Sequence, residues 1–280
     1  ETMKHRLEHM GRFDLICNIV ISAAAILNLF PLYWMISSSL KVSQDVSKMP
    51  PDWIPFPPAV QNYKNLFQTG HALTWTCNSF LIAIGTTAAI LLVSAMASYS
   101  FAKLRFWGRN TIFLAFILTL MIPKEIYIVP LIKVMQYLNL KGTYIGIILP
   151  NVALPFGVFL LRQFFATVPD SLRESAWLDG GSEWNVFTKI MLPICKPGLS
   201  ALAILMFVQT WNDYLWQMVM ITKDSMKTLQ LGVALMQQEN NPDYGLKMAS
   251  ACVAAVPMIL VFFVFQRYFT SGITMGAIKE

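Results

Sequence analysis

Long apolar stretches without charged residues dominate the pattern of the chain. The stretches 15–40, 72–102, 142–161 and 248–266 contain no Asp, Glu, Lys or Arg. A helix that crosses a bilayer needs about 20 predominantly apolar residues, whereas core helices of soluble proteins have shorter apolar runs of roughly 10–14 residues. Two further apolar stretches, 111–135 and 199–221, each carry charged residues. The pattern therefore predicts an all-α membrane protein with six transmembrane helices.

The predicted spans divide the chain into an N-terminal segment, 1–14, a six-span domain, 15–270, and a C-terminal tail, 271–280. The spans are expected at about 15–38, 74–101, 111–135, 143–165, 199–221 and 248–269. Prolines in the third, fourth and sixth spans predict bent or broken helices, which a membrane tolerates where neighbours cover the freed carbonyl groups. The proline-rich segment 41–72 is predicted to run extended rather than to form another helix.

Composition and charge agree with a bilayer setting. Of the 280 residues, 56% are hydrophobic and only 13% are charged. Lys and Arg are more frequent before span one, between spans two and three, between spans four and five and at the end than in the other connections. The positive-inside rule then places both termini in the cytoplasm. The net charge of +6 is thus explained by topology, and no nucleic-acid partner is expected. Lys103, Arg105 and Trp107 form a predicted anchor at the inner interface.

The segment 166–197, between the fourth and fifth spans, has a different pattern. Pro169, Asp170 and Ser171 are typical of a helix start, and apolar residues follow at helical spacing as far as Gly180 and Gly181. A second short helix, about 183–191, is predicted to end at Pro193. A compact unit of helix, turn and helix is therefore expected on the cytoplasmic face.

The same segment contains a spaced motif. Glu174-Ser175-Ala176 is followed, after three residues, by Gly180 and, after nine more, by Ile190-Met191-Leu192-Pro193. This motif resembles the cytoplasmic loop of the permease subunits of type I ABC importers, in which the first triplet reads Glu-Ala-Ala. Asn78-Ser79, Trp211-Asn212 and Gly276-Ala277-Ile278-Lys279 resemble the carbohydrate-uptake class, similar to the smaller permease of maltose-type systems. The resemblance covers about 60–280.

The resemblance implies a type I ABC importer permease fold in which this loop contains a coupling helix. Its ATPase-coupling residues would be Glu174, Ser175, Ala176, Asp179, Gly180, Ile190, Leu192 and Pro193. The implied partners are a second homologous permease, two ATPase subunits, an extracytoplasmic solute-binding protein and the lipid bilayer of a bacterial cytoplasmic (inner) membrane. The outer segment 222–246 is implied to reach the binding protein through Gln237, Gln238, Asn240 and Asn241.

Elementary physics gives the loop a similar role. An element that receives force from a soluble ATPase needs apolar sides for its own spans and polar tips for its partner. The residues expected to pack on the spans are Leu172, Ala176, Trp177, Leu192 and Pro193. The residues expected to face the partner or to cap neighbouring turns are Glu174, Asp179 and Glu183. The alternative is an ordinary amphipathic connector stabilised by its own caps.

Ionisable groups within the spans are candidate functional residues, because each costs about 2.5–3.5 kcal/mol near the centre of a membrane helix. Two interpretations remain open. In the first, polar and aromatic residues line a substrate pathway, since planar polar groups and aromatic faces bind sugars. These residues are Lys124, Glu125, Gln209, Trp211, Asn212, Asp213 and Tyr214. In the second, Lys124 and Asp213 form an ion pair that holds the helices together.

The predicted function is that of a permease subunit of an ATP-driven importer for a carbohydrate, an oligosaccharide above all. No catalytic or metal site is predicted, since His5 and His9 lack a third ligand. No G-x-x-x-x-G-K-[ST] phosphate loop occurs, so ATP and magnesium are expected in the partner ATPases and no cofactor in this chain. The alternatives are an ion-coupled secondary transporter, which usually contains internal repeats, and a type I ABC permease for another solute.

Overall fold

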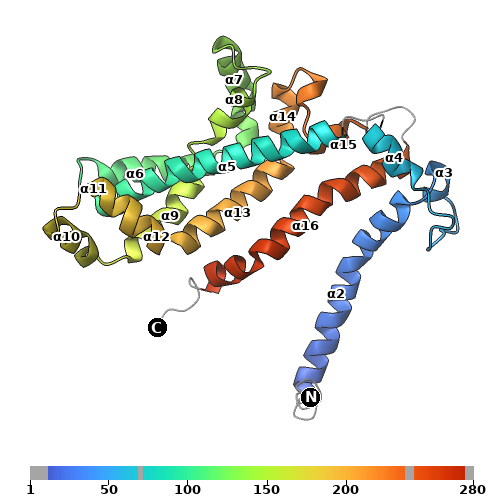
Figure 1. Cartoon of the computed structure of the whole chain (residues 1–280), viewed down its shortest axis with the longest axis horizontal. Coiled ribbons are helices and arrows are strands. Elements are labelled where there is room, and N and C mark those ends of the chain that lie inside the picture. Colours follow the sequence, from blue (N-terminus) through green and yellow to red (C-terminus); the bar gives the residue numbers. More distant parts are fainter. Residues whose placement is uncertain (1–11, 69–71, 237–242, 275–280) are drawn as a thin grey trace. The chain divides into compact units, whose positions relative to one another are not determined.

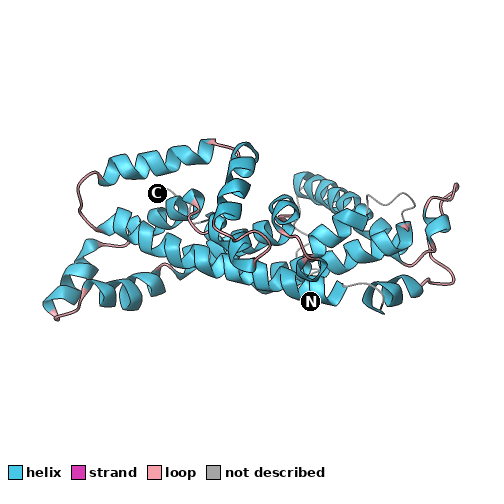
Figure 2. Cartoon of the chain, turned by 90° about the horizontal axis from the view of Figure 1, so that it is seen from above, coloured by secondary structure: helices cyan, strands magenta, loops and turns pink. Residues whose placement is uncertain are grey.

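The computed structural model describes residues 12–68, 72–236 and 243–274, and these contain helices, turns and loops but no strand (Figure 2). They belong to two compact units, one made of residues 1–70 and 236–253 and the other of residues 71–235 and 254–280. The helices, labelled as in Figure 1, are α2 (Arg12–Ser39), α3 (Ser43–Val46), α4 (Gln61–Gln68), α5 (Ala72–Lys103), α6 (Arg109–Leu118), α7 (Lys124–Tyr137), α8 (Tyr144–Ile148), α9 (Pro155–Thr167), α10 (Asp170–Leu178), α11 (Glu183–Asn185), α12 (Leu192–Ile194), α13 (Lys196–Asn212), α14 (Leu215–Met220), α15 (Leu229–Met236) and α16 (Tyr244–Thr274).

Three of the described helices are long and apolar enough to cross a membrane without a break: Phe13–Ser39, Ala72–Lys103 and Tyr244–Phe265. Three further candidates are bent helix pairs: Arg109–Met121 with Lys124–Tyr137 (103°), Tyr144–Asn151 with Pro155–Thr167 (50°), and Glu183–Ile194 with Lys196–Asn212 (75°). The chain has six spans if each bent pair crosses the membrane as one, so the predicted count of six stays a prediction.

Proline explains two of the breaks. Ile122 is extended (φ −94°, ψ 110°), as expected for a residue before a proline, and Pro123 directly precedes α7. Pro155 occupies the first turn of α9, where its missing N–H leaves no hydrogen bond unmade. By contrast, α16 continues through Pro257. The stretch predicted as span five, 199–221, is divided into α13 and α14 at Asp213.

In the first unit, α4 corrects the prediction that 41–72 forms no helix; the proline-rich stretch 50–58 itself contains none. The side-chain amide of Asn62 on α4 donates hydrogen bonds to the carbonyl oxygens of Ser39 and Lys41, both at 2.8 Å. The Ser39 hydroxyl lies 2.7 Å from that of Tyr63. The last carbonyl groups of a helix lack partners within it, and α4 supplies donors to the end of α2.

The second unit is built around α5, which packs against α9 and α13 (Figure 1). Small residues allow a close approach: the Ser98 hydroxyl donates to the Val158 carbonyl oxygen of α9 at 2.8 Å, and a Cβ added to Gly157 would lie 2.5 Å from the Ser94 hydroxyl oxygen. Tyr99 packs with Phe165 and Phe187 at one end of α5. A second cluster, which includes Ile82, Met135, Ile147 and Trp216, joins α5 to α7, α8 and α14.

Candidate functional site

The helix α10 has the bounds that the capping pattern indicates, and a pair of glycines ends it. Gly180 has a positive φ of 77°, which glycine adopts without strain. Its N–H donates to the Trp177 carbonyl oxygen at 3.0 Å, and the Gly181 N–H donates to that of Ala176 at 2.8 Å. A Cβ added to Gly181 would lie 2.7 Å from the Ala176 carbonyl oxygen, whereas one on Gly180 would meet no atom within 4 Å. The closed turn therefore depends on both glycines, for different reasons.

The second half of the loop is helical for longer than the sequence indicated. The Ser182 hydroxyl accepts a hydrogen bond from the Asn185 N–H at 3.3 Å and caps α11. A π-helical turn, Val186–Met191, leads into α12. The predicted end at Pro193 is wrong: this proline lies in the first turn of α12, where a missing N–H is tolerated, and the helix ends at Ile194.

Glu183 ties the two halves of the loop to α5. Its carboxylate accepts hydrogen bonds from the Tyr99 hydroxyl of α5, from Arg173 Nε at 2.8 Å and from Trp177 Nε1 at 3.1 Å. The Arg173 guanidinium stacks over the Trp177 ring, 4.1 Å from its centroid, and Nη1 donates to the Lys103 carbonyl oxygen at 3.1 Å. The expectation that Glu183 faces a partner or caps a turn is therefore corrected: its three donors hold it against the protein.

Lys103, the last residue of α5, holds the start of α10. Its ammonium group donates to the Val168 carbonyl oxygen at 2.5 Å and to Asp170 Oδ1 at 2.7 Å, and the residue is only 8% exposed. We call Tyr99, Lys103, Asp170, Arg173 and Glu183 the anchoring cluster. Sequence reasoning assigned Lys103 to the membrane interface and gave no role to Tyr99 or Arg173, since Tyr99 and Glu183 lie 84 residues apart.

The anchoring cluster sets the ionisation of its carboxylates. Burial by itself raises the pKa of Glu183, but the hydrogen bonds from Arg173 and Tyr99 outweigh it and hold that pKa below the usual value. For Arg173 the signs are reversed: burial lowers its pKa, but the hydrogen bond and charge of the Glu183 carboxylate raise it by more, so the pKa of Arg173 is raised overall. The hydrogen bond and charge of Lys103 lower the pKa of Asp170. These ion pairs therefore persist at neutral pH.

The opposite side of the loop is open. The coupling candidates Glu174, Ser175, Asp179, Gly180 and Pro193 are exposed. Ala176 and Leu192 pack on the core, and Ile190 is half-buried.

Exposed apolar residues accompany these polar ones. Leu178 is 90% exposed, and Leu172, Trp177 and Trp184 are also exposed. The prediction that Leu172 and Trp177 pack on the spans is thus wrong, because α10 lies beyond the end of α5 and only one side of it meets the core. The same prediction for Pro193 is wrong as well, since this residue of α12 is exposed. An exposed apolar patch with acidic neighbours is typical of a surface that binds another protein.

A second cluster of polar groups forms where three helices break. Lys124 is the first residue of α7, Asn151 ends the 3-10 turn after α8, and Asp213 follows α13. The Lys124 ammonium group lies 2.9 Å from Asp213 Oδ2 and 3.2 Å from Asn151 Oδ1. The other oxygen of Asp213 accepts from the Trp216 N–H at 3.1 Å and so starts α14. The predicted ion pair is present, and we call Lys124, Asn151 and Asp213 the break cluster.

A cavity of about 350 Å³ adjoins the break cluster, and five of the seven predicted pathway residues line it. Its lining consists of Lys124, Glu125, Ile128, Gln209, Asn212, Asp213, Leu215 and Trp216. Trp211 is instead 1% exposed: it stacks on Phe207, and its Nε1 donates to the Ala254 carbonyl oxygen at 3.3 Å. Tyr214 is exposed and does not line the cavity. Trp216 and Asn151 were not predicted, because Trp216 lies just beyond the polar stretch 209–214 and Asn151 stands among apolar residues, 27 residues from Lys124.

Comparisons with known proteins decide the family. Residues 82–275 match the family described as "Binding-protein-dependent transport system inner membrane component". The chain belongs to this family. It is 36% identical over 259 residues to an arabinooligosaccharides transport system permease protein, AraQ, of Halalkalibacterium halodurans, covering 91% of this chain and 92% of that one. It is 32% identical over 279 residues to a lactose transport system permease protein, LacG, of Rhizobium radiobacter, covering 99% of each.

Other relatives broaden the comparison. The permease is 34% identical over 276 residues to the sn-glycerol-3-phosphate transport system permease protein UgpE of Yersinia pestis, covering 95% of this chain and 98% of that one. A chain of a bacterial ABC transporter involved in the import of the acidic polysaccharide alginate has the same fold, with a TM-score of 0.81 at 22% identity over 93% of this chain and 99% of that one. The predicted all-α permease fold and membership of the ABC importer permeases are confirmed.

The remaining predicted site residues stay predictions. Gln237, Gln238, Asn240 and Asn241, expected to contact a binding protein, lie outside the described residues. The described helix α15 leads up to them, and Asn78 on α5 holds the preceding loop by donating to the carbonyl oxygens of Ser225 and Lys227 at 2.8 and 2.9 Å.

Proposed function

We propose that this permease moves a sugar, an oligosaccharide above all, across a bacterial inner membrane, driven by ATP that separate subunits hydrolyse. The chain itself carries out no chemistry. It works with a second homologous permease, two ATPase subunits that hold ATP and magnesium, and an extracytoplasmic binding protein that delivers the sugar. Both termini and α10 lie on the cytoplasmic side, as the distribution of Lys and Arg indicates.

The observation that carries the coupling role is the anchoring cluster. Glu174 and Leu178 of α10 and the following Asp179 are exposed to a partner. The other side of α10 is held at the last turn of α5 by Lys103, which bonds Asp170, and by Glu183, which accepts from both Tyr99 and Arg173. A load applied to the exposed side therefore reaches a long span directly. A connector stabilised only by its own caps has no need of an ion-pair network with a distant helix, and this supports coupling over the alternative.

Two observations support a sugar as the cargo. The relatives AraQ and LacG are named for arabinooligosaccharide and lactose transport, and the solved transporter of the same fold imports alginate. The cavity at the break cluster also brings together the amide groups of Gln209 and Asn212, which are planar polar groups of the kind that bind sugars. Lys124, Glu125 and Asp213 add charged groups to the same lining. We assign this cavity to the substrate pathway, with the ion pair as part of its wall.

Reconstitution in proteoliposomes tests the proposed function. With both permeases, the ATPases and the sugar-loaded binding protein present, uptake should require ATP and should be abolished when the ATPases are omitted. Arabinooligosaccharides, lactose, alginate oligosaccharides and glycerol 3-phosphate serve as competing cargoes. Uptake driven by a proton or sodium gradient without ATPases would instead establish the ion-coupled alternative, and preference for glycerol 3-phosphate would contradict a sugar.

The turn after α10 provides a graded test of coupling. Gly181→Ala forces a Cβ against the Ala176 carbonyl oxygen, so we expect it to abolish stimulation of ATP hydrolysis while the complex still assembles. Gly180→Ala meets no steric obstacle and costs only the left-handed backbone strain, about 1–2 kcal/mol. Gly180→Asn, which adopts this conformation more easily, should be milder still. Equal stimulation in all three variants would contradict a coupling role for the turn.

A further inference from the structure

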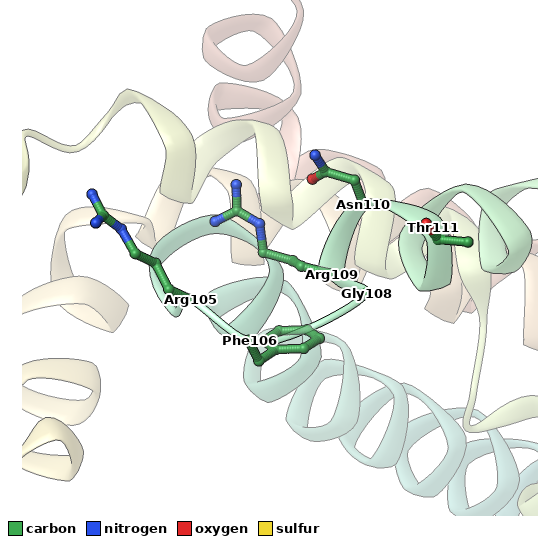
Figure 3. Close-up of a pocket in the computed structure, with 6 residues that line it drawn as sticks. All are labelled: Arg105, Phe106, Gly108, Arg109, Asn110 and Thr111. Atoms are coloured by element: carbon green, nitrogen blue, oxygen red, sulfur yellow. The ribbon is translucent and has the colours of Figure 1, made fainter.

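The loop between α5 and α6 forms an open pocket of about 490 Å³ that plays no part in the proposed function. It is lined by Arg105, Phe106, Gly108, Arg109, Asn110 and Thr111, none of them acidic. Figure 3 shows the side chains of Arg105, Arg109 and Asn110 extending to the same side of the loop, with the Phe106 ring on the other. All three side chains line the same pocket, so two guanidinium groups and an amide are available to an anion with several oxygen atoms.

Most hydrogen-bond donors of the two arginines are left for a ligand. Arg109 uses Nη1 to donate to the Leu104 carbonyl oxygen at 3.1 Å, which fixes its position, and a guanidinium has five N–H donors. Arg105 is exposed. Asp170, the carboxylate on which Arg105 acts electrostatically, is already paired with Lys103 at 2.7 Å. The pocket thus keeps a net positive charge.

Exposed apolar residues lie next to the pocket, in the α5–α6 loop and along α6. Trp107, next to Arg105 and Phe106, is 96% exposed. Along α6, which begins at the pocket, Ile112, Leu114 and Leu118 are exposed as well. Tryptophan and arginine gather at the level of lipid headgroups, and an apolar helix side beyond them contacts acyl chains. A soluble anion makes no use of these apolar neighbours, whereas a phospholipid engages both parts.

We propose that Arg105, Arg109 and Asn110 bind the phosphate of an anionic phospholipid, whose acyl chains cover the exposed side of α6. The proposal rests on the proposed function only for the leaflet, which is the one that contains the coupling end. Because only five residues separate Arg109 from Lys103, the last residue of α5, the bound lipid holds this end of α5 at a fixed depth in the membrane.

Lipid binding is measured on the purified complex by native mass spectrometry, with phosphatidylglycerol and phosphatidylcholine as probes. We expect retention of phosphatidylglycerol over phosphatidylcholine, and a loss of apparent affinity of about fivefold for each arginine removed in Arg105→Gln/Arg109→Gln. Lys133→Gln/Lys141→Gln, which removes the same charge from exposed positions elsewhere, serves as the control and should retain the lipid. Arg105→Gln alone serves as the test if the double variant unfolds, since its side chain is exposed.

A second measurement locates the lipid. Brominated phosphatidylglycerol should quench the fluorescence of Trp107. The contribution of Trp107 is the difference in quenching between the unchanged protein and Trp107→Phe. In Arg105→Gln/Arg109→Gln this contribution should disappear. Equal retention of phosphatidylglycerol by the arginine variant and the control would overturn the proposal. Displacement of the lipid by free glycerol phosphate would also overturn it, in favour of a soluble anion. Loss of ATPase subunits with unchanged lipid would assign the arginines to the ATPase surface instead.

Sugar uptake is assayed in parallel, so that the two proposals are tested separately. Selective retention of phosphatidylglycerol together with uptake independent of ATP would uphold the lipid site and contradict the proposed function. ATP-dependent sugar uptake in a complex without lipid selectivity would do the reverse.

Discussion

The two polar clusters of the permease use the same kinds of side chain in opposite ways. In the anchoring cluster, one carboxylate, Glu183, accepts hydrogen bonds from three donors, one on α5 and two on α10, and so joins these elements. In the break cluster, the pair Lys124–Asp213 joins the ends of helices that are already interrupted, and a cavity of about 350 Å³ lies beside it. We infer that the first arrangement resists separation of its segments, and that the interrupted helices at the second change their angles more easily.

This difference indicates where the permease is stiff and where it bends. A displacement of α10 relative to α5 requires the hydrogen bonds and ion pairs of the anchoring cluster to break together. Two helix pairs are interrupted beside the break cluster, with angles of 103° and 50° between their halves, so no continuous helix joins these halves. Variants of the two clusters should therefore fail in different ways.

The largest effect is expected from Glu183→Gln. Loss of the charged acceptor weakens three hydrogen bonds, each worth about 1.5–3 kcal/mol when a charged group takes part, so stimulation of ATP hydrolysis should fall at least about tenfold in an assembled complex. Tyr99→Phe, which removes one donor and keeps the ion pair, should lose less. Lys48→Gln, which breaks an exposed ion pair with Asp52 in the other unit, should have no effect. Equal losses in all three would contradict a special role for the anchoring cluster.

A smaller and different effect is expected at the break cluster. Lys124→Met should reduce sugar uptake about fivefold while stimulation of ATP hydrolysis persists, because Asp213 loses its partner beside the cavity. The double variant Lys124→Met/Asp213→Asn should recover part of the uptake, with an interaction free energy of about 1 kcal/mol in a double-mutant cycle. Asp213→Asn alone should leave assembly intact, and loss of the complex would show that the pair only holds the helices together. Uptake and ATP hydrolysis measured on the same vesicles decide between these results.

The smallest effect concerns pH. The folded pKa of Glu183 is depressed, so its contribution to stability is complete above the pKa of an ordinary glutamate, about 4.3, and is lost as the pH falls through the lower folded value. We expect the unfolding temperature of the purified permease to fall below about pH 4.3, and to fall less steeply in Glu183→Gln. Asp170 acts in the same direction, but weakly, because its carboxylate is exposed. Parallel acid profiles for both proteins would argue against an ionised Glu183 as the centre of the network.

Much of the fold follows from local sequence. Apolar runs of span length predict α2, α5 and α16, and the cap residues before and the glycines after 170–178 predict α10, because both signals act within a few residues. Pro123 and Pro155 indicate breaks for the same reason. The helix α4 was not predicted, because its stability comes from Asn62 bonding to the end of α2 more than 20 residues away.

The sites follow from sequence less completely. The charged residues Lys124 and Asp213 are conspicuous in apolar spans, and their pairing was one of two open possibilities. The anchoring cluster was not predictable, since Tyr99 and Glu183 look like an ordinary aromatic residue and an ordinary surface acid until folding joins them. Trp211, predicted to line the pathway, is buried against Phe80 and Phe207 instead, because an aromatic ring serves packing and binding equally well.

The helix α5 is unbroken over its 32 residues, a length of about 48 Å at 1.5 Å per residue. It is held near both ends: Tyr99 and Lys103 bond the segment 166–197, while Asn78 and Ser79 bond the backbone of 225–229, at the start of α15. A continuous helix resists stretching along its axis, so a shift of one end arrives at the other almost unchanged. A displacement at the α10 end of α5 would thus be passed to the opposite end of the span through one continuous helix.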